Sequence, residues 1–130
     1  MLARLYTGSE HIYAFNKSYH GTSGNSYSLT NVGTWASPVP KLSTVHTLAY
    51  PNLIRNPHHN VDSLVRDAEE TILSTSNHKI AGVWAEPILG VGGIVPLPEG
   101  YFKRLAEVTR KYGGLVISDE VQTGFGRIGR

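Results

Sequence analysis

Hydrophobic and polar residues follow a helical period in two stretches of the chain. In residues 61–74 the apolar positions share one face while the charged residues point away, which predicts an amphipathic helix. Its apolar positions are Leu64, Val65, Ala68 and Ile72. Asn60 or Asp62 is suited to cap its first turn. A second helix is predicted over residues 98–112, because Gly113 and Gly114 supply a stop. The side of this helix that we expect to pack inward carries Phe102, Leu105, Ala106 and Thr109.

Two short apolar runs flank the second helix and predict strands. Residues 80–85 suit a strand buried on both faces, and the run ends at Glu86 and Pro87, since proline cannot continue a central strand. Residues 115–118 form the second run, which ends at Asp119. The order strand, helix, strand predicts a βαβ unit with parallel strands and a right-handed crossover. The predicted fold class is therefore α/β, with a mostly parallel sheet.

The first half of the chain has weaker patterns. Residues 1–6 have the pattern of a helix end, residues 10–15 that of a strand, and residues 19–31 that of a loop or of short broken elements. Residues 34–60 hold four of the seven prolines and show no period, so we expect an irregular, mostly surface segment. The chain opens in a helix end and stops behind a glycine-rich turn. This predicts that residues 1–130 are an internal fragment of one larger domain.

Composition excludes several classes of function. The 130 residues are 40% hydrophobic and 17% charged, as in a folded domain. The formal net charge is +2 and the basic residues are scattered, which argues against a nucleic-acid partner. Cysteine is absent, which removes disulfides, thiol catalysis and thiolate metal sites. No apolar run reaches membrane-spanning length, so no membrane partner is expected.

The histidines do not predict a metal site. His58 and His59 are adjacent, so their side chains point in different directions in an extended chain, and no carboxylate is spaced to join them. We expect His11, His46 and His78 to be surface residues.

Two carboxylates stand where ligands bind in open α/β sheets, at the carboxyl ends of the predicted strands. These are Glu86 and Asp119. By position alone, Asp119 is more often a helix cap or a turn residue. The functional alternative is a buried anion that pairs with a cationic ring nitrogen, as pyridoxal phosphate requires of its protein.

Three motifs, in the same order along the chain, favour the functional alternative. Residues 119–127 read Asp-Glu-Val-Gln-Thr-Gly-Phe-Gly-Arg, residues 86–93 read Glu-Pro-Ile-Leu-Gly-Val-Gly-Gly, and residues 19–21 read Tyr-His-Gly. Together they resemble the signatures of the class III pyridoxal-phosphate-dependent aminotransferases. The resemblance covers the whole chain, although residues 34–78 carry little of it. It implies a partial fold-type I PLP-transferase large domain.

The resemblance also implies a role for each motif residue. Asp119 would pair with the pyridine nitrogen of the cofactor, and Gln122 would hydrogen-bond its phenolic oxygen. Val121 would pack against one face of the ring and Tyr19 against the other. Three further site residues are implied. His20 would lie beside the ring and adjust its aldehyde side, and Gly21 would let the backbone pass close to the cofactor. Glu86 would either face the substrate or support the residues that contact the cofactor.

In the family, the lysine that forms a Schiff base with the cofactor follows the 119–127 segment. None of the five lysines in this chain matches its context, so no catalytic residue is assigned and this chain alone is expected to be inactive. The family also implies a homodimer that acts on amino acids and 2-oxo acids.

Two departures from the family pattern bear on the substrate. Val91 stands where ornithine-type members carry a gating Glu, and Leu89 stands where Gln is common. Within the family, Val91 and phrases such as residues 29–33 are most similar to the alanine–glyoxylate subfamily. That subfamily implies alanine or a similar donor, glyoxylate or another 2-oxo acid as acceptor, and a mitochondrial location, with a cytoplasmic one as the alternative.

Two other readings stay open. The chain is alternatively a truncated, non-catalytic product, whose exposed strand edges and apolar faces would lower its solubility. A general nucleotide-binding α/β domain is the third reading. Residues 90–93 lack the Gly-x-Gly-x-x-Gly order directly after a strand that such a domain requires.

Overall fold

A four-stranded parallel sheet forms the centre of the computed structural model, which describes residues 1–36 and 38–129. The strand order is β2–β1–β3–β6. The strands are β1 (Ile12–Phe15), β2 (Val45–Leu48), β3 (Gly82–Ala85) and β6 (Leu115–Ser118). Because β1, β3 and β6 are neighbours and run in the same direction, their carboxyl ends lie together at one edge of the sheet. The predicted α/β class and parallel sheet are confirmed.

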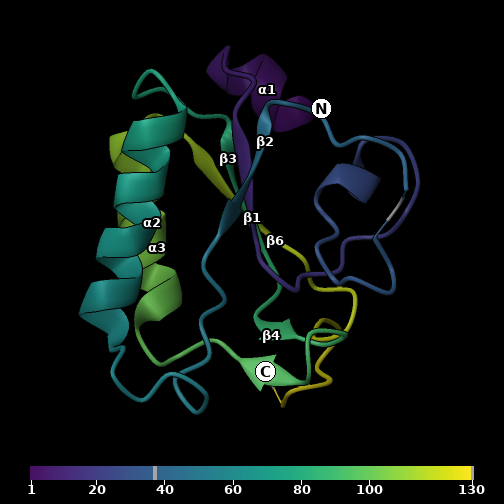
Figure 1. The fold of residues 1–130 in the computed structure, drawn as a ribbon, viewed down its shortest axis with the longest axis vertical. Helices are drawn as coiled ribbons and strands as arrows, with labels where there is room; N and C mark the ends of the chain where they lie inside the picture. The colour runs from purple at the N-terminus through teal and green to yellow at the C-terminus, as the bar shows by residue number, and fades with distance from the viewer. Residues whose placement is uncertain (37, 130) are drawn as a thin grey trace.

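Helices cover one face of this sheet. Helices α2 (Val61–Thr75) and α3 (Tyr101–Lys111) lie side by side on that face. Residues 16–36 and 38–44, with the short helix η1 (Ser26–Ser28), lie on the other (Figure 1). Helix α1 (Leu2–Thr7) lies near the amino ends of the strands. A small hairpin of β4 (Ile88–Leu89) and β5 (Val95–Pro96) lies beyond the carboxyl end of β3. Residues 90–93 form its turn, as predicted.

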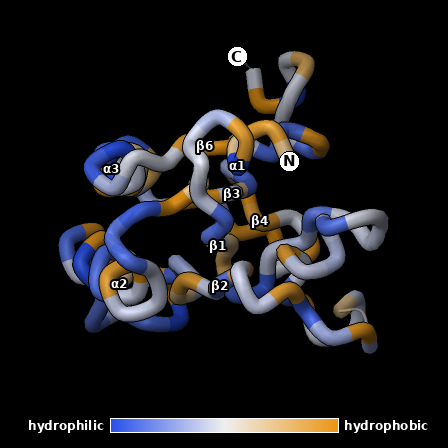
Figure 2. Tube along the Cα trace, turned by 90° about the horizontal axis from the view of Figure 1, so that it is seen from above, coloured by the Kyte–Doolittle hydropathy of each residue, from blue (hydrophilic) through white to orange (hydrophobic). Residues whose placement is uncertain are grey.

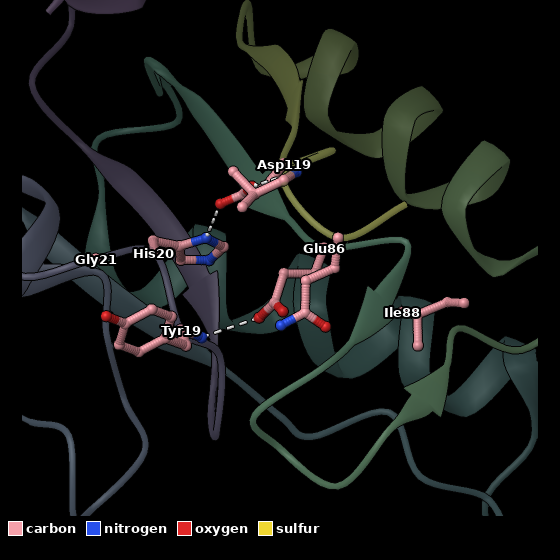
Figure 3. Close-up of a pocket in the computed structure, with 8 residues that line it drawn as sticks. Tyr19, His20, Gly21, Glu86, Ile88 and Asp119 are labelled. Carbon is pink, nitrogen blue, oxygen red and sulfur yellow. Dashed lines mark hydrogen bonds and ion pairs between the residues drawn. The ribbon is translucent and has the colours of Figure 1, made fainter. Parts of the chain in front are cut away.

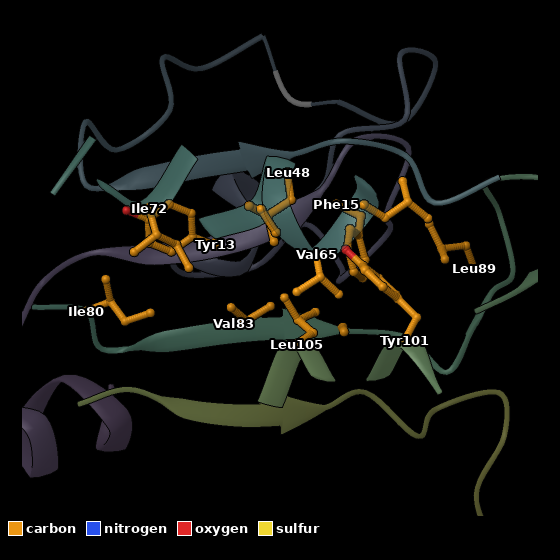
Figure 4. Close-up of a cluster of buried hydrophobic side chains, with 13 residues drawn as sticks. Tyr13, Phe15, Leu48, Val65, Ile72, Ile80, Val83, Leu89, Tyr101 and Leu105 are labelled. Atoms are coloured by element: carbon orange, nitrogen blue, oxygen red, sulfur yellow. The ribbon is translucent and has the colours of Figure 1, made fainter. Parts of the chain in front are cut away.

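The main core fills the space between the sheet and the two helices. Alternate strand residues point into it, as the period of two in a strand requires. Figure 2 shows the hydrophobic colour along β3 and β6 and the hydrophilic colour on the outer sides of α2 and α3. The fully buried members include Tyr13, Phe15, Leu48, Ile72, Ile80, Val83, Leu89, Tyr101 and Leu105 (Figure 4). A smaller apolar cluster on the opposite face contains Ile12, Ala14, Leu29 and Ala81, with Val45 and Trp84 packed against it.

Both predicted helices are confirmed. Helix α2 buries its four predicted apolar positions, and Asn60 caps it: Asn60 Oδ1 accepts the Ser63 N–H at 2.9 Å, while Ser63 Oγ accepts the Asn60 N–H at 3.0 Å. In α3, three of the four residues predicted to face inward are buried, and the aromatic residue that packs inward is Tyr101 instead of Phe102. Tyr101 is 1% exposed, whereas Phe102 is only partly buried.

The prediction for residues 34–60 is wrong at Val45–Leu48. These residues form β2, an edge strand paired in parallel with β1. Only Leu48 of the four is buried, because this edge strand needs no continuous apolar face, and its sequence therefore shows no alternation of apolar and polar residues. The segment is a strand because it pairs with β1. The surface prediction for His11 and His46 is also wrong. Both are half-buried, with His11 Nδ1 2.8 Å from His46 Nε2 and their rings stacked at 5.1 Å.

Two findings concern possible partners. Within residues 1–36 and 38–129, no three His, Cys, Asp or Glu side chains lie close enough together to hold a metal ion. No helix in the same ranges combines the length and the apolar character needed to cross a membrane.

Candidate functional site

The three sequence motifs meet in one cleft at the carboxyl ends of β1, β3 and β6. The cleft has a volume of about 190 Å³ (Figure 3). Its lining residues are Tyr19, His20, Gly21, Glu86, Ile88, Asp119, Val121 and Gln122. The fold thus brings all seven predicted site residues together. Ile88 was missed, because a single apolar residue behind a proline gives no signal in sequence.

Asp119 is held at the inner end of this cleft in a fixed orientation. Its backbone N–H donates to the carbonyl of Ala85 at 2.8 Å, which extends the pairing of β6 with β3. One carboxylate oxygen, Oδ1, accepts the N–H of Val121 at 3.2 Å, and the other, Oδ2, lies 2.8 Å from Nδ1 of His20. The side chain of Asp119 is 12% exposed and that of His20 is 0% exposed. A largely buried carboxylate in such contacts is suited to a cationic partner.

A buried threonine shapes the backbone beside this pair. The Thr30 hydroxyl accepts the N–H of His20 at 3.0 Å and donates to the carbonyl of Gly21 at 2.7 Å. Gly21 has a φ of +89°, which a residue with a side chain rarely adopts, so glycine is required there. His20 and Gly21 are therefore fixed in the cleft wall by Thr30, which is itself fully buried.

Glu86 links two walls of the cleft. Its Oε1 accepts the backbone N–H of Tyr19 at 2.9 Å, and its Oε2 accepts the backbone N–H of Gly90 at 3.0 Å. The residue is 6% exposed. Since each carboxylate oxygen already accepts a backbone donor, the geometry favours a structural link over direct contact with a substrate.

Gln122 lies against the hairpin turn. A Cβ added to Gly90 would meet Gln122 Oε1 at 2.1 Å, so the absence of a side chain at residue 90 leaves room for the amide. Val121 is 84% exposed although it lines the cleft. The ring of Tyr19 meets Trp35 edge to face at 5.7 Å.

The residues of the cleft fit the ring of pyridoxal phosphate. The ring has a basic nitrogen, a phenolic oxygen and two apolar faces, and the cleft offers a carboxylate, an amide and an aromatic side chain, from Asp119, Gln122 and Tyr19. None of the described residues that line the cleft is Lys or Arg. The lining therefore matches the ring and supplies no cation for the phosphate.

The comparisons with known proteins agree with the motifs. The family model described as aminotransferase class-III matches residues 2–130. This chain belongs to the class III aminotransferases, a family of pyridoxal-phosphate-dependent enzymes.

Individual relatives are similar over nearly the whole chain. It is 37% identical over 152 residues to human "Alanine--glyoxylate aminotransferase 2, mitochondrial", covering 99% of this chain and 30% of the relative. It is 39% identical over 129 residues to a [LysW]-aminoadipate semialdehyde/glutamate semialdehyde transaminase of Sulfurisphaera tokodaii, covering 98% of this chain and 29% of that relative. The chain thus spans about a third or less of the length of these relatives.

A solved structure shows the same fold. A thermostable (S)-enantioselective omega-transaminase from Thermomicrobium roseum superposes with a TM-score of 0.89 at 36% sequence identity. The match covers 99% of this chain and 32% of that one.

Proposed function

We propose that the protein to which this chain belongs transfers an amino group from alanine or a similar donor to glyoxylate or another 2-oxo acid. Membership of the class III aminotransferases supports amino-group transfer. The similarity to the alanine–glyoxylate relative supports the choice of substrates. The observation that carries the proposal is the convergence of Tyr19 with Asp119 and Gln122, from two segments far apart in the sequence, in one cleft.

Each residue of the cleft has a distinct part in holding the cofactor. Asp119 would accept a hydrogen bond from the protonated pyridine nitrogen, and Gln122 would donate to the phenolic oxygen. Tyr19 and Val121 would hold the ring between them, and Gly21 would allow the backbone to approach it. When bound, pyridoxal phosphate supplies an electron sink for charge that develops on the substrate, and Asp119 strengthens this sink by keeping the ring nitrogen protonated.

The described residues that line the same cleft do not include a lysine. Transamination needs a base within hydrogen-bond reach of the reacting carbon, and in this family that base is a lysine. Because none of the described residues that line the cleft is a lysine, we propose that this chain by itself binds the ring without turnover. A homodimer and a mitochondrial location are part of the proposal for the whole protein. The location rests on the name of the human relative.

The direct test is equilibrium dialysis of the purified chain against increasing concentrations of pyridoxal phosphate. The bound cofactor is measured by its absorbance. Asp119→Asn removes the charge that pairs with the ring nitrogen, and a charge-assisted hydrogen bond contributes about 1.5–3 kcal/mol. The dissociation constant should therefore rise about 10- to 100-fold. Asp62→Asn is the matched control, because the Asp62 side chain is 76% exposed and does not line the cleft. Equal binding by the wild-type chain and Asp119→Asn would contradict the assignment.

A second assay tests activity. The chain is incubated with alanine, glyoxylate and pyridoxal phosphate, and pyruvate is measured. We expect no pyruvate above the level given by the cofactor alone. Pyruvate formation by the wild-type chain would overturn the proposal that it lacks the proton-moving base.

The alternative is a truncated, non-catalytic product that binds no cofactor. The exposed side chains of Val121 (84%) and Phe125 (104%) beside the cleft favour it, since apolar groups of this size are seldom left in water. Failure of cofactor binding together with a broad, non-cooperative unfolding transition would support this alternative.

A further inference from the structure

Two buried nitrogen atoms have no hydrogen-bond partner in the protein. Within residues 1–36 and 38–129, these are Nε2 of His20 and Nε1 of Trp84. Buried polar groups are almost always hydrogen-bonded, because an unpaired one costs about 1–3 kcal/mol. Neither nitrogen therefore has its partner among the residues that the structure describes.

The two rings are neighbours behind Asp119. Trp84 is on β3 and faces away from α2 and α3, since its strand neighbours Val83 and Ala85 point into the main core. The ring centres of His20 and Trp84 are 5.8 Å apart, with 48° between the planes. Both side chains border a second pocket, open to solvent, of about 460 Å³, whose other lining residues are Ser118, Asp119, Glu120, Val121 and Phe125.

The chemistry of the two nitrogens is complementary. An indole Nε1–H can only donate. His20 Nδ1 lies 2.8 Å from the Asp119 carboxylate, so the proton of a neutral ring is on Nδ1 and Nε2 is left as an acceptor. A single partner shared by the two nitrogens has to accept from Trp84 and donate to His20, and a hydroxyl group does both.

Side chains that could serve are already engaged. The Ser118 hydroxyl donates to Glu120 Oε1 at 2.7 Å, and the Thr123 hydroxyl donates to Glu120 Oε2. A water molecule needs only about 10–15 Å³ of free space and at least two polar partners, and the two unpaired nitrogens are such partners.

We propose that Trp84 and His20 hold one buried water molecule between Nε1 and Nε2. The Trp84 Nε1–H donates to this water, the water donates to His20 Nε2, and His20 Nδ1–H donates to Asp119 Oδ2. The chain of hydrogen bonds fixes the tautomer of His20, which makes Trp84 a positioning residue for Asp119. The water site rests on the geometry alone, whereas the effect of Trp84 on the cofactor rests on the proposed function.

Nitrogen-15 NMR of the wild-type chain and of Trp84→Phe tests the site directly. In the wild-type chain we expect His20 protonated at Nδ1, a hydrogen-bonded resonance for Nε2, and a cross-peak between the Trp84 indole proton and a bound water. In Trp84→Phe the Nε2 resonance should move to the value of a free acceptor while Nδ1 stays protonated. Trp35→Phe is the control, because Trp35 is the other of the two tryptophans, is 55% exposed and contacts Tyr19 rather than His20.

The opposite outcomes are equally definite. A proton on Nε2 of His20, or an indole proton of Trp84 that exchanges as fast as that of Trp35 and shows no water contact, would overturn the proposal. The wild-type spectra decide even if Trp84→Phe does not fold. In the cofactor titration, Trp84→Phe should bind pyridoxal phosphate about fivefold more weakly, which corresponds to one ordinary hydrogen bond. If no variant binds the cofactor, the proposed function fails while the NMR result on the water site still stands.

Discussion

The link made by Glu86 gives the sharpest prediction for stability. Glu86→Gln keeps the size of the side chain but replaces one carboxylate oxygen by an NH2 group. One of the two backbone donors, the N–H of Tyr19 or of Gly90, then faces another donor. The cleft loses one of the two bonds that tie its walls together.

The magnitude follows from the type of bond. A hydrogen bond to a charged group contributes about 1.5–3 kcal/mol to stability. Both bonds are only partly buried, so we take the lower end, about 1.5 kcal/mol. With a urea m-value of about 2 kcal/mol/M, the midpoint of unfolding should fall by about 0.7 M. Glu86→Ala removes both bonds, so its midpoint of unfolding should fall by roughly twice as much.

The assay is urea unfolding of the full chain, followed by tryptophan fluorescence and circular dichroism at the same denaturant concentrations. Glu107→Gln is the matched control. Glu107 is exposed on α3, and substitutions at such positions change stability by no more than about 0.5 kcal/mol. If Glu86→Gln unfolds at the same midpoint as Glu107→Gln, the reasoning about the link is refuted.

Three further predictions concern the frame around the cleft. Leu105→Ala in the main core should lower the free energy of unfolding by about 2–5 kcal/mol, whereas Leu5→Ala, at a side chain that is 72% exposed, should change it little; urea unfolding measures both. Asn60→Ala removes the cap of α2 and should cost about 1 kcal/mol, seen as a lower melting temperature, and an unchanged value would mean that the cap contributes nothing. Burial and the neighbouring His11 lower the pKa of His46, so the folded state binds a proton less readily than the unfolded state. The contribution of neutral His46 to the stability of the fold is therefore complete above about pH 6.5 and is lost as the pH falls from there through the lowered pKa. Over this pH range, His46→Asn should make the melting temperature fall less steeply than in the wild-type chain. A parallel fall in both proteins would contradict this.

Much of the architecture could be predicted from local patterns. The period of 3.6 in residues 61–74 predicted α2 and its buried face, because each turn of a helix has to present apolar residues on the same side. The apolar runs 80–85 and 115–118 predicted β3 and β6. The three motifs at residues 19–21, 86–93 and 119–127, through their resemblance to the class III family, predicted the seven candidate residues of the cleft. These features depend on residues that are near one another in sequence.

Features that depend on pairing between distant segments could not be predicted in the same way. Val45–Leu48 is a strand because it pairs with β1, and its own sequence shows no strand period. The hydrogen bond between His11 and His46 exists only because that pairing brings the two rings together.

The sequence by itself determined which side chains were available for chemistry: a carboxylate at residue 119, an amide at residue 122, and an aromatic ring and an imidazole at residues 19 and 20. Only the tertiary structure decided how they are oriented. The adjacency of β1, β3 and β6 brings His20 to Asp119 across 99 positions of sequence and places Glu86 between two backbone donors. It also leaves His20 Nε2 and Trp84 Nε1 without a partner among the described residues. The physical reason is that hydrogen bonds and burial act at distances of a few ångströms, and the fold alone sets which distant residues come that close.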